Sequence, residues 1–402
     1  MDILKGSITT PQGYLAAGVA CGLKKNGQPD LALVISEHEA VVAGVFTTNR
    51  VKGHSLVRSM EKMARGSTRG AIINSGNANA CVGDAGLDDA DEMAAAVADA
   101  IGCQPDDILT GSTGVIGKRL DMQAIRSGVR QATASLDHDD SAGHRAERAI
   151  MTTDLLPKEG VTQFPVQNVT VTLAGMAKGS GMIHPNMATM ICVMTTDATI
   201  GQPLLHQLLL DVTNQTFNRV SVDGDTSVCD MVLVMANGSA LAPEILPGTA
   251  EANLFREALM TISTHLARLI ARDGEGATKL AEIQVHGAKT ATDAYQIVQA
   301  VGRSPLVKTA LYGEDANWGR ILTAAGYSGA DFDPCGCDIY LGGLKVCEGG
   351  NALLFDEKEA KDILKQDEIL IRIELTDGNA SDHLWTCDFS CDYVKINGSY
   401  RT

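Results

Sequence analysis

The sequence predicts a protein of the mixed α/β (α+β) class, and three observations support that prediction. Segments typical of strands and of helices alternate along all 402 residues, a length that suits two or three domains. Hydrophobic residues make up 45% of the chain and aromatic residues only 4%, which favours sheets rich in alanine, valine and isoleucine. The 41 glycines indicate many tight turns between these elements.

The first half of the chain begins with strands and then alternates. Short runs bounded by Gly, Pro and Asn predict strands at 14–23, 31–36, 41–47 and 70–80. A strand at 108–109 is expected to run into a loop at 110–114. The segment 169–173 alternates like a strand, and we expect it to pair with the apolar run that follows Thr189. Helices are expected at 88–101, which opens with acidic residues, and at 122–136.

The second half continues the alternation. Helices are expected at 204–212 and 250–272, with a buried strand at 231–235 between them. From about residue 279 the pattern predicts a strand at 280–288, a helix at 292–302, a strand at 307–313 and a helix at 318–326. The tail, 368–378 followed by 383–398, is expected to form a β-hairpin. We therefore place a domain boundary near residue 282.

Charge and composition exclude several classes of function. The chain has 33 basic and 49 acidic residues and a net charge of −16, without a basic stripe, so nucleic acid is not an expected partner. No apolar run approaches the roughly 18 residues of a membrane helix, and the N-terminus lacks a signal layout. The ten cysteines are then expected to be reduced thiols in the cytoplasm. Their spacing matches no standard zinc pattern, so no metal is expected.

The segment most informative about chemistry is Lys178–Met190, KGSGMIHPNMATM, which places a threonine directly before an expected apolar strand. A hydroxyl needs a base to become a nucleophile. Cutting the bond before Thr189 would free an amine that titrates close to neutral pH and serves as that base. The simpler interpretation is that GSG forms a turn and Thr189 lies in an ordinary strand. The residues alone favour this simpler interpretation.

Several further segments match one known family at matching spacing, from the first strands to the last residue. They are INSGNANACVG at 73–83, TGSTGVIG at 110–117, SVDGDTS at 221–227, ARDGEGATK at 271–279, EDANWGRIL at 314–322 and YVKING at 393–398. Together with KGSGMIHPNMATM they resemble the ornithine acetyltransferase family. The resemblance implies a cut between Ala188 and Thr189, with Thr189 as the nucleophile.

The resemblance also implies the other site residues. Thr113 and Gly114 are expected to form the oxyanion hole, where a hydroxyl and a backbone N–H stabilise the charge that develops in acyl transfer. Without the resemblance they would be interpreted as a turn. The substrate contacts that it implies are Thr152, Lys178, Thr189, Glu275, Asn397 and Thr402. Lys178 suits the substrate carboxylate and Glu275 an ammonium group. The alternatives are solvated surface charges for these two residues and a frayed tail for Asn397 and Thr402.

The implied fold is a four-layer αββα sandwich, similar in layering to N-terminal-nucleophile enzymes, with a smaller C-terminal α/β domain. Residues 1–282 would form the self-cleaving catalytic core, and 283–402 the domain that completes the substrate site. The mature protein would consist of chains 1–188 and 189–402, associated as a heterotetramer with two copies of each.

The implied reaction is a ping-pong transfer within arginine biosynthesis. Acetyl moves from N-acetylornithine to Thr189 and then to glutamate, giving ornithine and N-acetylglutamate. No cofactor is expected, although acetyl-CoA as a second acetyl donor is expected for a bifunctional member. Two alternatives remain open: a self-cleaving amidase or aminopeptidase in which water accepts the acyl group, and an uncleaved protein that binds a small anion.

Overall fold

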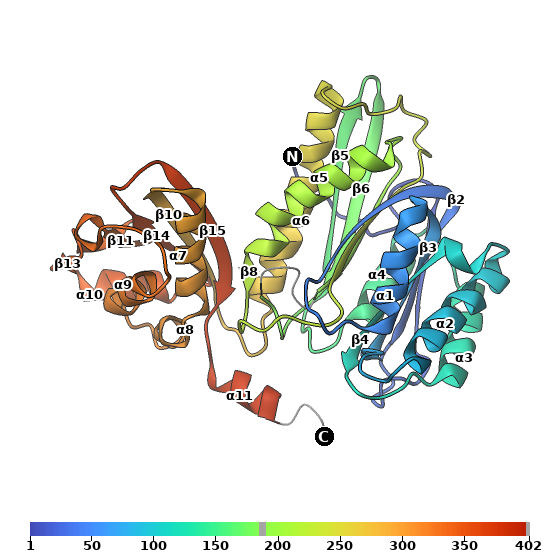
Figure 1. Cartoon of the computed structure of the whole chain (residues 1–402), viewed down its shortest axis with the longest axis horizontal. Helices are drawn as coiled ribbons and strands as arrows, with labels where there is room; N and C mark the ends of the chain where they lie inside the picture. The colour runs from blue at the N-terminus through green and yellow to red at the C-terminus, as the bar shows by residue number, and fades with distance from the viewer. Residues whose placement is uncertain (185–189, 399–402) are drawn as a thin grey trace. The chain divides into compact units, whose positions relative to one another are not determined.

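The computed structural model describes residues 1–184 and 190–398 of the chain, which divides into two units. Unit 1 comprises Met1–Asn218 and Thr226–Leu266, and unit 2 comprises Arg219–Asp225 and Ala267–Thr402. Each unit contains both helices and strands (Figure 1), which confirms the predicted mixed α/β class.

Unit 1 alternates between strands and helices. Its strands are β1 (Tyr14–Val19), β2 (Leu31–Phe46), β3 (Ser67–Asn77), β4 (Ile108–Val115), β5 (Lys158–Val166), β6 (Val169–Lys178), β7 (Ile191–Thr196) and β9 (Met231–Ala236). Its helices are α1 (His54–Lys62), α2 (Ala85–Ile101), α3 (Met122–Ala134), α4 (Asp140–Ile150) and α5 (Gln202–Gln215), while α6 (Ala250–Arg272) runs from unit 1 into unit 2. Short 3₁₀ turns cover Met63–Arg65, Pro105–Asp107 and Phe217–Arg219.

The strands of unit 1 form one sheet in the order β4-β3-β2-β9-β7-β6-β5, and β1 pairs with the first part of β2. The pairs β3–β4 and β7–β9 are parallel. Strands β6 and β7 are antiparallel, in a register that runs from Leu173↔Thr196 to Lys178↔Ile191. The strand predicted at 169–173 thus pairs with the apolar run after Thr189, although of the predicted residues only Leu173 lies in this ladder, which continues to Lys178.

Buried hydrophobic residues pack on both faces of the sheet of unit 1, and helices cover it (Figure 1). In β2, Ala32 and Val34 lie in a core shared with strands β7 and β9, whereas Leu31 and Leu33 pack with residues of α2 and α3. On the other side α6 packs on β6, where a Cβ added at Gly175 would contact α6 side chains. Helices and a large sheet packed in this way agree with the expected αββα sandwich.

Two expectations for the strands of unit 1 were wrong. The segments expected as separate strands at 31–36 and 41–47 form the single strand β2. The exposed residues 37–39 lie within it, where its register to β3 shifts. The expected loop 110–114 belongs to β4, because β3 extends far enough to pair with it through Ser112 and Gly114. Polar side chains are tolerated there because they bond one another, as Ser112 Oγ does with Asn74 Oδ1 at 2.6 Å.

Unit 2 is built around a second sheet in the order β13-β12-β11-β14-β10-β15-β8. Its strands are β8 (Val220–Ser221), β10 (Leu280–Ala288), β11 (Asp338–Leu341), β12 (Leu344–Glu348), β13 (Asn351–Ala352), β14 (Glu368–Glu374) and β15 (Ala380–Cys387). Its helices are α7 (Ala291–Arg303), α8 (Pro305–Tyr312), α9 (Trp318–Gly326), α10 (Glu357–Leu364) and α11 (Cys391–Gly398), with a 3₁₀ turn at Pro334–Gly336. The boundary expected near residue 282 falls within β10, and the division of function at that point stays a prediction.

Two expectations for unit 2 were also wrong. The segment 307–313, expected as a strand, lies mostly in α8, because Pro305 occupies the first turn and the Ser304 hydroxyl accepts the Val307 N–H at 3.3 Å. The expected terminal hairpin does not form, because β10 lies between β14 and β15 and pairs with both. The residues after β15 form α11 instead of continuing the sheet.

Within the described residues, no helix combines the length and the apolar character needed to cross a membrane.

The close packing of β1 against α4 gives a test of this fold. A Cβ at Gly18 would collide with the backbone carbonyl of Arg145 in α4. We expect Gly18→Ala to lower the free energy of unfolding by about 1 to 3 kcal/mol, measured by urea denaturation. In the control Gly201→Ala the new Cβ would meet nothing closer than 3.7 Å, and we expect a loss below about 1 kcal/mol. Equal losses for the two variants would contradict this packing.

Candidate active site

Lys178 and Thr113, two predicted site residues, are in contact within unit 1. Lys178 is the last residue of β6, Thr113 lies in β4, and both are buried. The Lys178 Nζ donates to Thr113 Oγ1 at 3.3 Å. This contact forms although four strands, β3, β2, β9 and β7, lie between β4 and β6 in the sheet order. The curvature of the sheet therefore brings together a predicted substrate contact and a predicted oxyanion donor.

The direction of this hydrogen bond matters for chemistry. A hydroxyl has two acceptor lone pairs and one hydrogen to donate. Because Thr113 Oγ1 accepts from Lys178, its own hydrogen can point at a third group. This arrangement suits a donor that stabilises a developing oxyanion.

Gly114 follows Thr113 in a backbone conformation that side chains rarely adopt, with φ of +132°. A Cβ at this position would collide with the backbone of Gly76 and Asn77 in β3. Glycine at both 76 and 114 thus lets the ends of β3 and β4 approach closely where their register becomes irregular.

The charge of Lys178 is only partly compensated. Burial lowers the pKa of its ammonium group, and the nearby Asp154 carboxylate opposes this effect. A lysine of this kind gives up its proton more readily than an exposed one.

Asp154 connects Lys178 to a third predicted residue. Its carboxylate accepts the Gly179 N–H at 2.6 Å and the Thr152 N–H at 2.8 Å, and it pairs with Lys158 Nζ at 2.8 Å. Burial raises the pKa of Asp154, but Lys158 and Lys178 outweigh burial and hold that pKa well below its usual range. Asp154 therefore fixes Thr152 beside the residue that follows Lys178.

Unit 2 brings together the predicted residues Glu275 and Asn397. Asn397 Nδ2 in α11 donates to Glu275 Oε2 at 2.8 Å. The loop that carries Glu275 lies against the start of α11, because Ser390 Oγ donates to the Gly276 carbonyl at 2.6 Å. Glu275 is buried, so it is not a solvated surface charge, whereas Asn397 is exposed in the last turn of α11.

The remaining predicted site residues, Ala188, Thr189 and Thr402, lie outside the described residues. The predicted residues Thr113, Gly114, Thr152 and Lys178 belong to unit 1, and Glu275 and Asn397 belong to unit 2.

Sequence reasoning missed Asp154, Glu147 and Asp230, three buried acidic residues in unit 1. Asp230 Oδ1 accepts the Met190 N–H at 3.1 Å, directly after the predicted cut. The only signal in the sequence is an acidic residue directly before the apolar run of β9. Such a residue is usually interpreted as a surface charge at a strand end.

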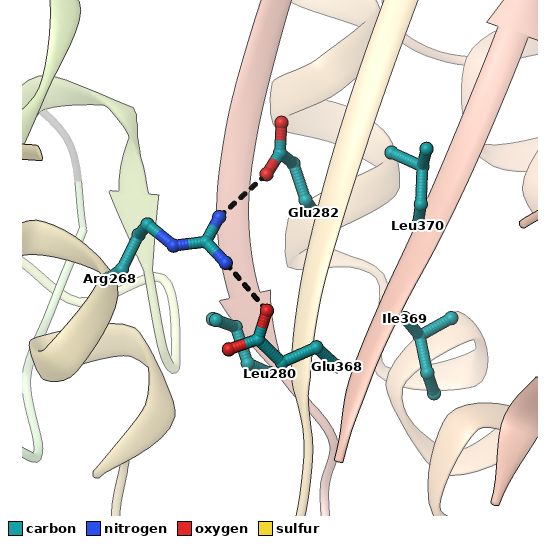
Figure 2. A pocket seen from close by; sticks show the side chains of 6 residues that line it. All are labelled: Arg268, Leu280, Glu282, Glu368, Ile369 and Leu370. Carbon is teal, nitrogen blue, oxygen red and sulfur yellow. Dashed lines mark hydrogen bonds and ion pairs between the residues drawn. The ribbon is translucent and has the colours of Figure 1, made fainter. Parts of the chain in front are cut away.

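A hollow of about 200 Å³ in unit 2 is lined by Arg268, Leu280, Glu282, Glu368, Ile369 and Leu370 (Figure 2). Arg268 extends into it and pairs with Glu282 at 2.8 Å and with Glu368 at 2.7 Å. Trp385 Nε1 also donates to Glu282 at 3.0 Å. These charges are matched to one another and tie α6 to β10 and β14, so we assign the hollow a structural role.

A family model described as the ArgJ family matches residues 15–402 of the chain. The chain belongs to the ArgJ family. Membership confirms the predicted ornithine acetyltransferase family and the prediction that the chain is an acyltransferase enzyme.

Individual ArgJ proteins are similar to this chain over their whole length. The arginine biosynthesis bifunctional protein ArgJ of Caldanaerobacter subterraneus subsp. tengcongensis is 49% identical over 406 residues, with 100% of both chains covered. The protein of the same name from Symbiobacterium thermophilum is 47% identical over 404 residues, also with 100% of both covered. The crystal structure of the Bacillus halodurans ArgJ protein is 43% identical, with a TM-score of 0.50, and it covers 51% of this chain and 97% of that chain.

The structure offers the ArgJ chain no evident metal centre in its described part. Residues 1–184 and 190–398 contain no group of three or more His, Cys, Asp or Glu side chains placed to hold a metal ion. Burial, with a smaller contribution from Cys347, raises the pKa of the Cys337 thiol to about 12, and burial also raises the pKa of the Cys347 thiol. They behave as protonated core residues.

Glu147 in α4 is a buried acid outside the predicted site, and only one of its two oxygens is bonded within the described residues. Its Oε1 accepts the Lys158 N–H at 2.9 Å, and among the described residues nothing donates to Oε2. Burial, which the Lys158 N–H opposes, raises the pKa of Glu147 from 4.5 to about 8.

This raised pKa predicts a pH-dependent stability. Between pH 4.5 and about 8 the folded chain holds a proton that the unfolded chain has lost, so stability falls as pH rises. We expect the unfolding free energy of the natural chain to decrease relative to Glu147→Gln across this range, by at most about 5 kcal/mol. Urea denaturation at a series of pH values measures the difference. A difference that stays constant, or that increases as pH rises, would refute the buried, protonated state of Glu147.

Proposed function

We propose that the chain cuts itself between Ala188 and Thr189 and then transfers acetyl from N-acetylornithine to glutamate through an acetyl ester on Thr189 Oγ. The contact between Lys178 and Thr113 carries this proposal. It joins a buried cation suited to a substrate carboxylate to a hydroxyl suited to an oxyanion, next to the strand that begins just after Thr189.

The strand register supports a cut at this place. Lys178 and Ile191 are paired in the β6–β7 ladder, and the proposed cut lies between them in the sequence. A cut there leaves every β6–β7 pair intact, so chains 1–188 and 189–402 would stay associated.

The length of a solved relative also supports the cut. The Bacillus halodurans ArgJ chain aligns over 97% of its own length, yet it covers only 51% of this chain. A relative that exists as two separate chains would give this result. The proposed chains here contain 188 and 214 residues of the 402.

In the proposed reaction the new amine of Thr189 takes the proton of its own hydroxyl, which then attacks the acetyl carbonyl. Thr113 Oγ1 and the Gly114 N–H donate to the oxyanion, and Lys178 attracts the substrate α-carboxylate. Glu275 attracts an ammonium group, while Thr152, Asn397 and Thr402 complete the substrate contacts. Ornithine leaves, and glutamate then accepts the acetyl group.

Further parts of the proposal concern donors and assembly. The enzyme needs no cofactor, acetyl-CoA acts as a second acetyl donor, and the two chains form a heterotetramer in the cytoplasm. The bifunctional names of the relatives support the second donor.

Self-cleavage gives a direct test by intact mass. Purified natural protein should show two chains, and N-acetylornithine should add the mass of one acetyl group to the chain that begins at Thr189. Thr189→Ala should remain a single unacetylated chain without turnover. Acetylation of the shorter chain, or normal turnover by Thr189→Ala, would remove Thr189 as the nucleophile.

The acceptor is tested separately. With glutamate saturating, we expect N-acetylglutamate to form at least about tenfold faster than free acetate, because an enzyme that holds glutamate at the acyl ester favours it over water. Both products are measured by chromatography from the same reaction. Acetate as the dominant product would instead support the amidase or aminopeptidase alternative.

A further inference from the structure

Self-cleavage has a chemical requirement that the mature site does not. Before the cut, the nitrogen of Thr189 is an amide and offers no basic lone pair. When the bond from Ala188 breaks, this nitrogen becomes a poor leaving group unless it receives a proton. A group that stores a proton near residue 189 is therefore needed for this step.

Asp230 contacts the residue next to this bond. Strands β7 and β9 are parallel neighbours, and Ile191 pairs with Met231. Met190 is held from both sides: its carbonyl accepts the Met231 N–H at 3.0 Å, and its N–H donates to Asp230 Oδ1 at 3.1 Å. The Asp230 backbone is itself fixed, because its carbonyl accepts the Thr47 N–H at 3.0 Å. The carboxyl group is thus aimed at the start of β7.

The second carboxyl oxygen of Asp230 is available. Asp230 is fully buried, and among the described residues nothing bonds to Oδ2. The titratable groups around Asp230 are Lys178 from β6 and the adjacent Cys229 thiol, with the hydroxyls of Thr47 and Ser227 also close.

The surroundings favour the acid form. Burial raises the pKa of the Asp230 carboxyl well above its ordinary value, while the Met190 N–H and Lys178 oppose this effect. A buried carboxylic acid with one unbonded oxygen has a proton to donate.

We propose that Asp230 holds the proton that the Thr189 nitrogen takes up as the Ala188–Thr189 bond breaks, an inference that rests on the proposed site of cleavage. The Thr189 Oγ–C bond forms and the C–N bond breaks. The Asp230 carboxyl gives its proton to the nitrogen, and the carboxylate recovers a proton from the Thr189 hydroxyl. The step changes no net proton count, and water then hydrolyses the ester to release the two chains.

The variant Asp230→Asn separates this role from a structural one. The amide oxygen of Asn can still accept the Met190 N–H, but the side chain cannot act as an acid near neutral pH. We expect its cleavage to be at least about 100-fold slower than that of the natural chain. Both are made by cell-free synthesis and followed by denaturing gel, with circular dichroism to confirm the native fold.

Glu147→Gln is the matched control. Glu147 is also a fully buried acid with one oxygen bonded to a backbone N–H and the other unbonded among the described residues, but it contacts β5 and not residue 190. Its cleavage should proceed at the natural rate. Equally slow cleavage in both variants would show a general effect of losing buried acids and would overturn the role of Asp230.

The pH profile gives a second measurement that does not depend on any variant folding. The acid form is the active one, so natural cleavage should slow as pH rises through the raised pKa of Asp230, whereas Asp230→Asn should show no such decrease. A natural rate that does not decrease with rising pH overturns the inference, as does fast cleavage by folded Asp230→Asn.

These failures are distinct from failure of the proposed function. If the natural chain stays whole, or if Thr189→Ala is cut, then the proposed cleavage itself is wrong. If the natural chain is cut before Thr189 and Asp230→Asn is cut equally fast, only the role of Asp230 is wrong.

Discussion

The burial of the Lys178 ammonium at the end of β6 is the constraint on which the unit 1 site depends. Removing a cation from water costs several kcal/mol unless nearby groups compensate it. Asp154 supplies part of that compensation and at the same time binds the backbone of Thr152 and Gly179. A single carboxylate thus reduces the cost of the buried charge and positions two segments. Thr113 comes within reach only because the sheet curves until β4 approaches the end of β6.

Most of the elements could be predicted from local pattern, and the errors share a physical cause. Helix α6 was expected at 250–272 and lies at Ala250–Arg272, because a long amphipathic repeat leaves little choice. By contrast, β4 carries the polar residues Thr110, Ser112 and Thr113, which indicate a loop unless their bonds to β3 are known. The expected terminal hairpin failed for a similar reason, since nothing in 368–398 shows that β10 lies between the two strands.

The site was predictable only in part. The resemblance implied Thr113, Lys178, Glu275 and Asn397 as separate site residues. The structure brings Thr113 into contact with Lys178, and Glu275 into contact with Asn397. Neither pair follows from spacing, because 65 residues separate the first and 122 the second. Asp154 and Asp230 were missed because an isolated acid beside a strand gives no sign of its burial. Whether such a residue is a solvated charge or a buried acid depends on tertiary packing alone.

The pairing between β6 and β7 has a consequence for the order of folding and the proposed cleavage. A break at residue 188 before folding would leave two polypeptides, each with an unpaired inner strand of a large sheet. Exposed strands of this kind promote aggregation. If the proposed cut occurs, we therefore expect it after the tertiary structure has formed, with the uncut chain as its own template. Producing the two halves from separate genes would lose this intramolecular assembly, even though every residue of the mature enzyme would be present.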